Sequence, residues 1–160
     1  MAAIAYLSAG SNLGDRKANL EFAMNALAAK SAVKKRSAYF ETEPVGYLTQ
    51  PWFLNIAVEI ETPLEPRQLL AFCHGIEESC GRTRAFSNAP RTLDLDILLF
   101  GELVVTEEHL VIPHPRLAER RFVLEPLAQI APGVTHPVLR KSIRALLEEC
   151  TDPSEVRRFE

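Results

Sequence analysis

The spacing of apolar residues in the first third of the chain predicts alternating strands and helices. Small and apolar residues at 4–9 indicate a strand that ends at the turn sequence of residues 10–12. Apolar residues then recur at helical intervals, which predicts a helix over about 15–27. A β-type stretch at 33–40 follows. Residues 41–51 contain two prolines and a glycine and are expected to form a long loop.

The middle of the chain repeats this order. Residues 53–62 are substantially apolar on both faces, which is typical of a strand inside a sheet. Helical spacing from Pro66 onward predicts a second amphipathic helix, with Gly81 as its C-terminal cap. Residues 82–91 lack periodicity and indicate a second exposed loop, whereas 92–100 alternate as a strand.

The last third of the chain is less regular. A short strand is predicted near residues 104–105, and the prolines within 112–115 indicate a rigid extended loop. Residues 121–130 fit either a strand or a helical turn, while 142–150 predict a terminal helix. The tail after residue 150 is expected to be a disordered end.

The order of these elements suggests the fold class. Strand, helix, strand, strand, helix, strand is typical of an α+β sandwich, a mainly antiparallel sheet with helices packed on one face and long loops at one edge. The chain has 160 residues, of which 47% are hydrophobic, so it is long enough to bury one core. We therefore expect a single domain spanning residues 1–160.

Composition indicates which kind of molecule the protein binds. The formal net charge of −3 excludes the strongly basic surface of a general nucleic-acid binder. No segment has the basic start of a targeting sequence or the apolar length of a membrane span. The three cysteines form no CxxC pair and favour a reducing compartment. The sequence thus predicts a soluble cytoplasmic protein with a small-molecule partner, and neither nucleic acid nor a membrane.

The tripeptide Asp94-Leu95-Asp96 carries the main chemical signal. Two carboxylates two residues apart on a strand project to the same side, while Leu93, Leu95 and Ile97 face the other. Keeping both carboxylates ionised on a largely buried strand is costly unless cations lie beside them. Mg²⁺ meets that need, since it takes one or two carboxylates together with substrate phosphates. A bare pair on a solvated face remains the alternative for this motif alone.

Cationic residues flank this acidic pair on both sides. The guanidinium group matches phosphate oxygens, so a metal-binding pair between two arginine-bearing segments indicates a polyphosphate site. Transfer of a phosphoryl-type group needs mainly positioning and charge neutralisation. The flanking residues are Arg82, Arg84 and Arg91 before the pair, and His114, Arg116, Arg120 and Arg121 after it. For His114, a phosphate contact and a plain surface imidazole remain open.

Two other patterns are weaker. Residues 10–14, Gly-Ser-Asn-Leu-Gly, lack the lysine of a nucleotide P-loop and favour a tight turn with a side-chain cap. The four histidines have no zinc-type spacing with each other or with cysteines. On periodicity alone, Trp52, Phe53 and Phe122 are core residues.

Residues 88–99, Asn-Ala-Pro-Arg-Thr-Leu-Asp-Leu-Asp-Ile-Leu-Leu, resemble the signature of the 6-hydroxymethyl-7,8-dihydropterin pyrophosphokinase family of folate biosynthesis. Further segments follow in that family's order and approximate spacing, and the resemblance covers the chain to about Pro132. These segments are 10–14, 42–46, 50–55, 81–84, 113–115 and 120–123.

The resemblance implies a ferredoxin-like α+β fold, with a mainly antiparallel sheet, helices on its faces and long active-site loops. It also implies an ATP-dependent diphosphotransferase that moves the β,γ-diphosphate of MgATP to the hydroxymethyl oxygen of the reduced pterin and releases AMP. By the same resemblance, Asp94 and Asp96 hold two Mg²⁺ ions, and Arg82 and Arg91 stabilise charge in the transition state. A monomer is expected.

The resemblance further divides the site residues into two sets. On the nucleotide side it places Leu70, His74, Glu77, Arg82, Arg84, Arg91, Ile97, His114 and Arg120. On the pterin side it places Phe53 and Phe122 against the ring, Asn55 at its polar edge, the backbone of Thr42 and Val45 beside it, and Asp94 near the hydroxymethyl group. Ser87 and Asn88 depart from the basic and aromatic residues that many members carry there, which leaves ATP affinity or lid closure open to change.

Two rival functions stay open at this point. A ferredoxin-like module that only binds a nucleotide or a protein would show no Mg²⁺-dependent turnover. A related nucleotidyltransferase would release diphosphate in place of AMP. Product analysis separates all three.

Overall fold

The computed structural model describes residues 2–43, 51–81 and 92–159. The two predicted loops therefore lie mostly outside the described residues, at 44–50 and 82–91. In chain order the elements are β1 (Ala3–Ser11), α1 (Arg16–Leu27), β2 (Ala32–Arg36), β3 (Phe40–Thr42), β4 (Phe53–Thr62), α2 (Pro66–Ser79), β5 (Asp94–Phe100), β6 (Val105–Glu107), β7 (Leu110–Ile112), the 3₁₀ turn η1 (Leu117–Glu119), α3 (Arg121–Ile130), α4 (Ile143–Glu149) and β8 (Val156–Arg158).

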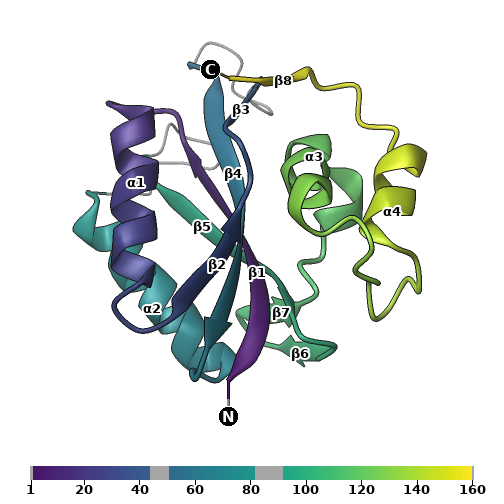
Figure 1. Ribbon diagram of the computed structural model, residues 1–160, viewed down its shortest axis with the longest axis horizontal. Coiled ribbons are helices and arrows are strands. Elements are labelled where there is room, and N and C mark those ends of the chain that lie inside the picture. The colour runs from purple at the N-terminus through teal and green to yellow at the C-terminus, as the bar shows by residue number, and fades with distance from the viewer. Residues whose placement is uncertain (1, 44–50, 82–91, 160) are drawn as a thin grey trace.

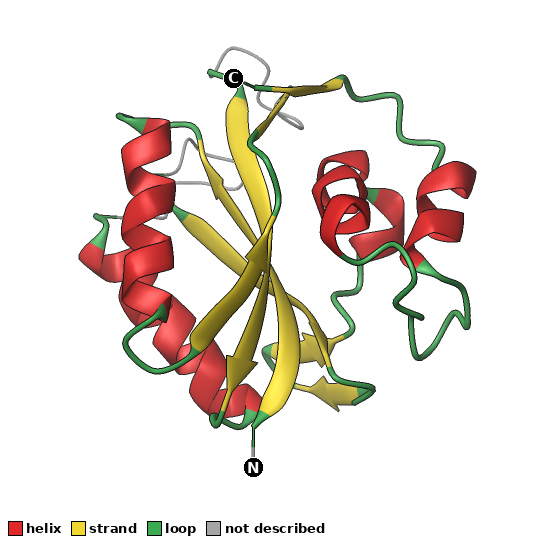
Figure 2. Cartoon of the chain, viewed as in Figure 1, coloured by secondary structure: helices red, strands yellow, loops and turns green. Residues whose placement is uncertain are grey.

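One antiparallel sheet organises the molecule. Its strands follow the order β5-β1-β4-β3-β8, and β2 pairs with residues 58–61 in the C-terminal half of β4. The hairpin β6-β7 forms a second, two-stranded sheet. The α+β class with a mainly antiparallel sheet is thus confirmed (Figure 2).

Helices cover both faces of the sheet, which corrects the expectation from element order that they pack on one. Helices α1 and α2 lie on one face, and α3 and α4 lie on the other (Figure 1). The reason is that the central strands carry apolar side chains on both of their faces. On β4, Ile56 and Val58 pack towards α1 and α2, while Ala57 packs with the α3 residues Leu124 and Leu127.

Local signals explain where the first two helices begin and end. The Asp15 side chain caps α1 by accepting a hydrogen bond from the Ala18 backbone at 3.1 Å. Pro66 opens α2, and Gly81, just after its end, has a φ of +83°, which favours glycine. The predicted helices are therefore present with nearly the predicted bounds.

The first strand is longer than predicted. Residues 10–12 were expected to form a turn, yet Gly10 and Ser11 continue β1 and pair with Asn55 and Leu54 of β4. Backbone hydrogen bonding to a long neighbouring strand outweighs the turn preference of these residues. As a result, Gly10 lies inside the sheet, where it contributes to the site described below.

The C-terminal third also differs from the sequence pattern. Residues 121–130, which fitted a strand or a helical turn, form helix α3, and the predicted terminal helix is α4 with Ser142 as its N-cap. The tail after residue 150, predicted to be disordered, contains β8, which pairs with β3. A single domain over residues 1–160 stays a prediction.

Two further observations concern the cysteines and the search for membrane-spanning helices. The three cysteines are free, and burial raises the pKa of the Cys73 thiol to about 12, so it is an inert core residue. Among the residues that the structure describes, no helix has the length and apolarity needed to cross a bilayer.

Candidate active site

The two aspartates lie on β5, the outermost strand on one side of the sheet. Asp94 pairs with Gly10 of β1 and Asp96 pairs with Ser8, and both side chains are half-buried. Leu93 and Leu95 are buried on the opposite face. The carboxylates therefore share the face of the sheet that α3 covers, although they are not buried in its core.

Glu77 of α2 fixes the backbone between the two aspartates. Its side chain is only 3% exposed, and its Oε2 accepts a hydrogen bond from the Leu95 backbone N–H at 2.7 Å. Because β5 lies at the edge of the sheet, no strand of the described residues pairs with this N–H. A carboxylate from a rigid helix thus holds the peptide that sets the direction of both Asp94 and Asp96.

His114 stands beside the aspartates as a neutral imidazole. Its backbone N–H donates to the Leu98 carbonyl of β5 at 2.9 Å, and its Nδ1 accepts from the Arg116 N–H at 3.1 Å. Burial and the charge of Arg120 lower the pKa of His114, and the nearby Asp94 offsets this only in part. At neutral pH the ring proton therefore lies on Nε2, which can donate a hydrogen bond to an anion.

Arg120 brings a positive charge to the same region. Burial lowers its pKa, as does neighbouring Arg116, whereas Asp96 and Asp94 raise it. A guanidinium stays protonated at physiological pH in spite of such shifts. Its Cζ also lies 5.5 Å from the centre of the Phe122 ring, so it links the acidic pair to the first turn of α3.

Three polar and aromatic residues on β3 and β4 form the second half of the site. The Asn55 carboxamide donates from Nδ2 to the Thr42 Oγ1 at 2.8 Å, and both side chains are buried, at 4% and 1% exposed. Phe53, half-buried, pairs with Thr42 across the two strands. The family resemblance assigned only the backbone of Thr42 to pterin recognition. The structure shows in addition that the Thr42 hydroxyl orients the Asn55 side chain.

The two halves of the site are joined in one row across the sheet. Asp94 pairs with Gly10, and Gly10 pairs with Asn55. Directly paired residues project to the same face, and neighbouring strands lie about 4.8 Å apart, so Asp94 and Asn55 face the same space roughly 10 Å from each other. A small ring held at Asn55 can thus extend a substituent towards the aspartates.

Gly10 makes this row possible, and sequence analysis missed it. A Cβ at Gly10 would lie 2.4 Å from the Asn55 Oδ1 and 3.5 Å from the Phe53 ring. The signal was a glycine inside a strand pattern, which often marks close approach by another group. The sequence instead indicated a turn.

Replacing Gly10 by alanine should weaken recognition at Asn55. The methyl group would displace the Asn55 carboxamide from Thr42, and we expect a loss of about 1–3 kcal/mol in the free energy of unfolding, with a raised KM for the substrate that Asn55 is predicted to bind. Thermal unfolding and steady-state kinetics measure the two effects. Gly133→Ala is the control, because a Cβ there meets nothing within 4 Å. A Gly10→Ala protein with wild-type KM would contradict this role.

The remaining predicted residues divide into two groups. On α2, Leu70 is half-buried and His74 is exposed. Ile97 is buried on the side of β5 that faces α2. The predicted adenosine contacts therefore line the opposite side of the edge strand from Asp94 and Asp96. Val45, Arg82, Arg84 and Arg91, together with Ser87 and Asn88, lie outside the described residues.

A groove of about 710 Å³ elsewhere does not coincide with this site. It runs between α1 and α2, and its lining includes Phe22, Phe72 and Gly75 but none of the predicted site residues. The predicted catalytic and binding side chains instead gather along the row from Asp94 to Asn55, on the opposite face of the sheet from this groove.

Comparison with known proteins identifies the class. Residues 6–132 match the family model described as 7,8-dihydro-6-hydroxymethylpterin-pyrophosphokinase. A Bacillus subtilis protein named 2-amino-4-hydroxy-6-hydroxymethyldihydropteridine pyrophosphokinase is 50% identical over 133 residues, covering 82% of this chain and 80% of the relative. A Methylorubrum extorquens protein of the same name is 43% identical over 158 residues, covering 98% of each chain.

Solved structures agree on the fold. The crystal structure of wild-type Plasmodium falciparum HPPK-DHPS superposes with a TM-score of 0.75 at 17% sequence identity, covering 93% of this chain. This chain spans only 45% of that longer one. At this level of identity the likeness supports the architecture of the sheet and its helices.

Proposed function

Because the chain belongs to the 7,8-dihydro-6-hydroxymethylpterin-pyrophosphokinase family, we propose that the row from Asp94 to Asn55 is where it performs that family's reaction. The protein is a pyrophosphokinase of folate synthesis, an ATP-dependent diphosphotransferase. The hydroxymethyl oxygen of the pterin attacks the β-phosphorus of ATP and releases its proton, the bond from that phosphorus to the oxygen bridging it to the α-phosphorus breaks, and AMP leaves with that oxygen. The observation that carries the assignment is the alignment of Asp94, Gly10 and Asn55 across three strands.

The acidic pair fits a hard divalent cation. Asp94 and Asp96 share one face of β5 and are half-buried, so both side chains are partly accessible. Two carboxylates completed by substrate phosphates and water form a typical donor set for Mg²⁺. Bound Mg²⁺ supplies charge neutralisation at the phosphate oxygens. We propose two ions, with Asp94 and Asp96 as the protein ligands of both.

His114 and Arg120 hold the phosphate chain. The neutral His114 donates from Nε2, and Arg120 adds a fixed positive charge close to both aspartates. The His114 backbone is tied to β5 through its hydrogen bond to Leu98, so this donor keeps its place before substrate arrives. Arg82, Arg84 and Arg91 are proposed to complete the nucleotide side, with Arg82 and Arg91 acting on transition-state charge. Glu77 acts on this side by holding the Leu95 peptide.

The pterin ring is held between Phe53 and Phe122. Asn55, with its carboxamide oriented by Thr42, provides both a donor and an acceptor for the polar edge of the ring. Flat aromatic faces supply affinity, and the buried amide supplies identity, because an unmatched buried polar group is costly. The backbone of Val45 is proposed to complete this contact. In this arrangement the hydroxymethyl group points towards Asp94.

We further propose that the protein acts as a monomer in the cytoplasm, as one domain, with the small-molecule substrates ATP and 6-hydroxymethyl-7,8-dihydropterin. Neither nucleic acid nor a membrane has a part in the reaction.

Chromatography of nucleotide products tests the assignment. The purified protein is incubated with MgATP, with and without 6-hydroxymethyl-7,8-dihydropterin. We expect AMP that forms only when the pterin is present. Release of free diphosphate would favour a nucleotidyltransferase, and no turnover at all would favour a binding module.

A further inference from the structure

The C-terminal strand β8 lies beside β3, one of the two strands that carry the proposed pterin-binding residues. It pairs with β3 in the register Thr42 to Val156 and Glu41 to Arg157, and it covers the outer edge of β3. Strand β3 has only three residues, and such short strands need partners on both sides to be well fixed. Figure 1 shows β8 crossing the top of the sheet beside β3, close to the C-terminus.

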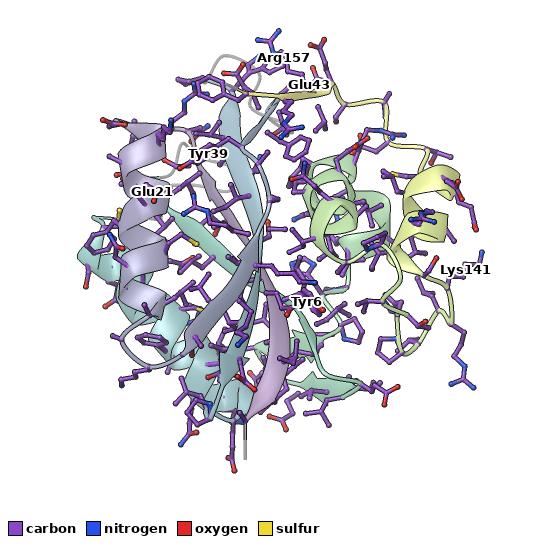
Figure 3. All side chains as sticks on the ribbon, viewed as in Figure 1. Tyr6, Glu21, Tyr39, Glu43, Lys141 and Arg157 are labelled. Carbon is purple, nitrogen blue, oxygen red and sulfur yellow. The ribbon has the colours of Figure 1, made fainter. Side chains whose placement is uncertain are left out.

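Further hydrogen bonds extend this pairing beyond β3. The Glu43 N–H donates to the Glu155 carbonyl at 3.2 Å, and the Glu155 N–H donates to the Glu43 Oε1 at 2.8 Å. At the other end of β8, the Phe159 N–H donates to the Tyr39 carbonyl at 2.9 Å. The C-terminal segment therefore holds Tyr39 and Glu43, which flank β3 and are labelled in Figure 3.

A charged cluster lies behind the pterin residues. Glu41, with a side chain 14% exposed, accepts from Arg16 of α1 at 2.9 Å and from Arg157 of β8 at 2.8 Å. Burial raises the pKa of Glu41, but the hydrogen bonds from Arg157 and Arg16 outweigh this and leave the pKa below its ordinary value. Since side chains alternate along a strand, Glu41 projects away from the face that carries Thr42.

The same two arginines also fix the start of β4. Arg16 donates to the Trp52 carbonyl at 2.9 Å, and the Arg157 guanidinium lies 4.7 Å from the centre of the Trp52 ring. The Asn12 side chain adds a hydrogen bond to the Pro51 carbonyl at 3.0 Å. Trp52 precedes Phe53 directly, so the cluster determines how the proposed ring-stacking residue enters the sheet.

We propose that Arg157, through Glu41 and Trp52, is a positioning residue for pterin binding, and that β8 is the element that delivers it. This inference rests on the proposed function. Arg157 contacts the strands that carry Thr42, Phe53 and Asn55 from the face opposite the substrate, so it does not touch the pterin. Its effect is to keep Thr42 and Phe53 aligned across the β3-β4 pair.

Steady-state kinetics of Arg157→Ala test this role. We expect the KM for the pterin to rise about two- to fivefold, in keeping with the loss of an ion pair whose arginine side chain is 59% exposed, while the KM for ATP stays at its wild-type value. Arg157→Lys keeps the charge but loses the planar two-nitrogen contact, so its pterin KM should be intermediate. Arg144→Ala is the control, because it removes an exposed arginine of α4 and leaves the Glu41 cluster intact.

Thermal unfolding separates positioning from folding. If Arg157→Ala unfolds at the assay temperature, Glu41→Gln weakens the same contacts while keeping hydrogen-bonding capacity, and it should raise the pterin KM in the same selective way. Unchanged pterin KM in a folded variant, an equal rise in Arg144→Ala, or a parallel rise in both KM values would overturn the inference. A wild-type protein that makes no pterin-dependent AMP would overturn the proposed function itself.

Discussion

Replacing Asp96 by asparagine is expected to lower turnover by roughly 10²–10³-fold or more, the range seen when one fixed electrostatic contact to a developing charge is lost, while leaving the fold intact. Asparagine has nearly the same shape, but it lacks the negative charge needed to hold a divalent cation. Because Asp96 is half-buried on a strand edge, the substitution creates no cavity. Asp94→Asn should have a similar effect on turnover, with a raised KM for the pterin as well.

A Mg²⁺ titration distinguishes metal binding from other roles of these aspartates. Each variant is assayed over a wide range of Mg²⁺ at saturating ATP, alongside circular dichroism to show that it is folded. The control is Glu102→Gln, which removes an exposed carboxylate just beyond the other end of β5. Asp96→Asn with wild-type turnover and wild-type Mg²⁺ dependence would contradict the assignment of the metal ligands.

Glu77→Leu is expected to reduce both stability and turnover, because it removes the acceptor that the Leu95 N–H uses. A buried donor left without a partner costs about 1–3 kcal/mol in the free energy of unfolding. Release of this peptide would also let Asp94 and Asp96 shift, and displacements of about 1 Å at a catalytic group can cost on the order of 100-fold in rate.

The comparison with Glu77→Gln separates these effects from simple loss of charge. Glutamine retains an oxygen that can accept from Leu95, so its stability should stay near that of the wild type and its turnover should exceed that of Glu77→Leu. Denaturant unfolding and kcat measurements report the two quantities. Equal turnover in the two variants would show that the carboxylate charge, and not the hydrogen bond to β5, is what the reaction needs.

Local signals predicted the elements that carry most of the site. Alternation at residues 92–100 gave a strand with Asp94 and Asp96 on one face, and helical spacing with Pro66 and Gly81 gave the helix that carries Glu77. These predictions succeed because they depend on periodicity and on caps, which act over a few residues. Each was close to the observed bounds.

Contacts between distant parts of the chain were beyond such signals. Nothing local in residues 156–158 indicates β8, which exists through pairing with β3 more than a hundred residues earlier in the chain. The close approach of Gly10 to Asn55 likewise depends on the register of β1 with β4. The order of elements alone placed the helices on one face, because it does not state which face α3 and α4 cover, whereas the family resemblance implied helices on both faces.

The most direct test of the central claim follows the phosphates of ATP into the products. ATP labelled separately at its α, β or γ phosphorus is incubated with the protein, Mg²⁺ and 6-hydroxymethyl-7,8-dihydropterin, and the label in the pterin product is measured. We expect the β and γ labels both to appear in the pterin product and the α label to stay in AMP. Transfer of the γ label alone, or of the α label, would contradict it.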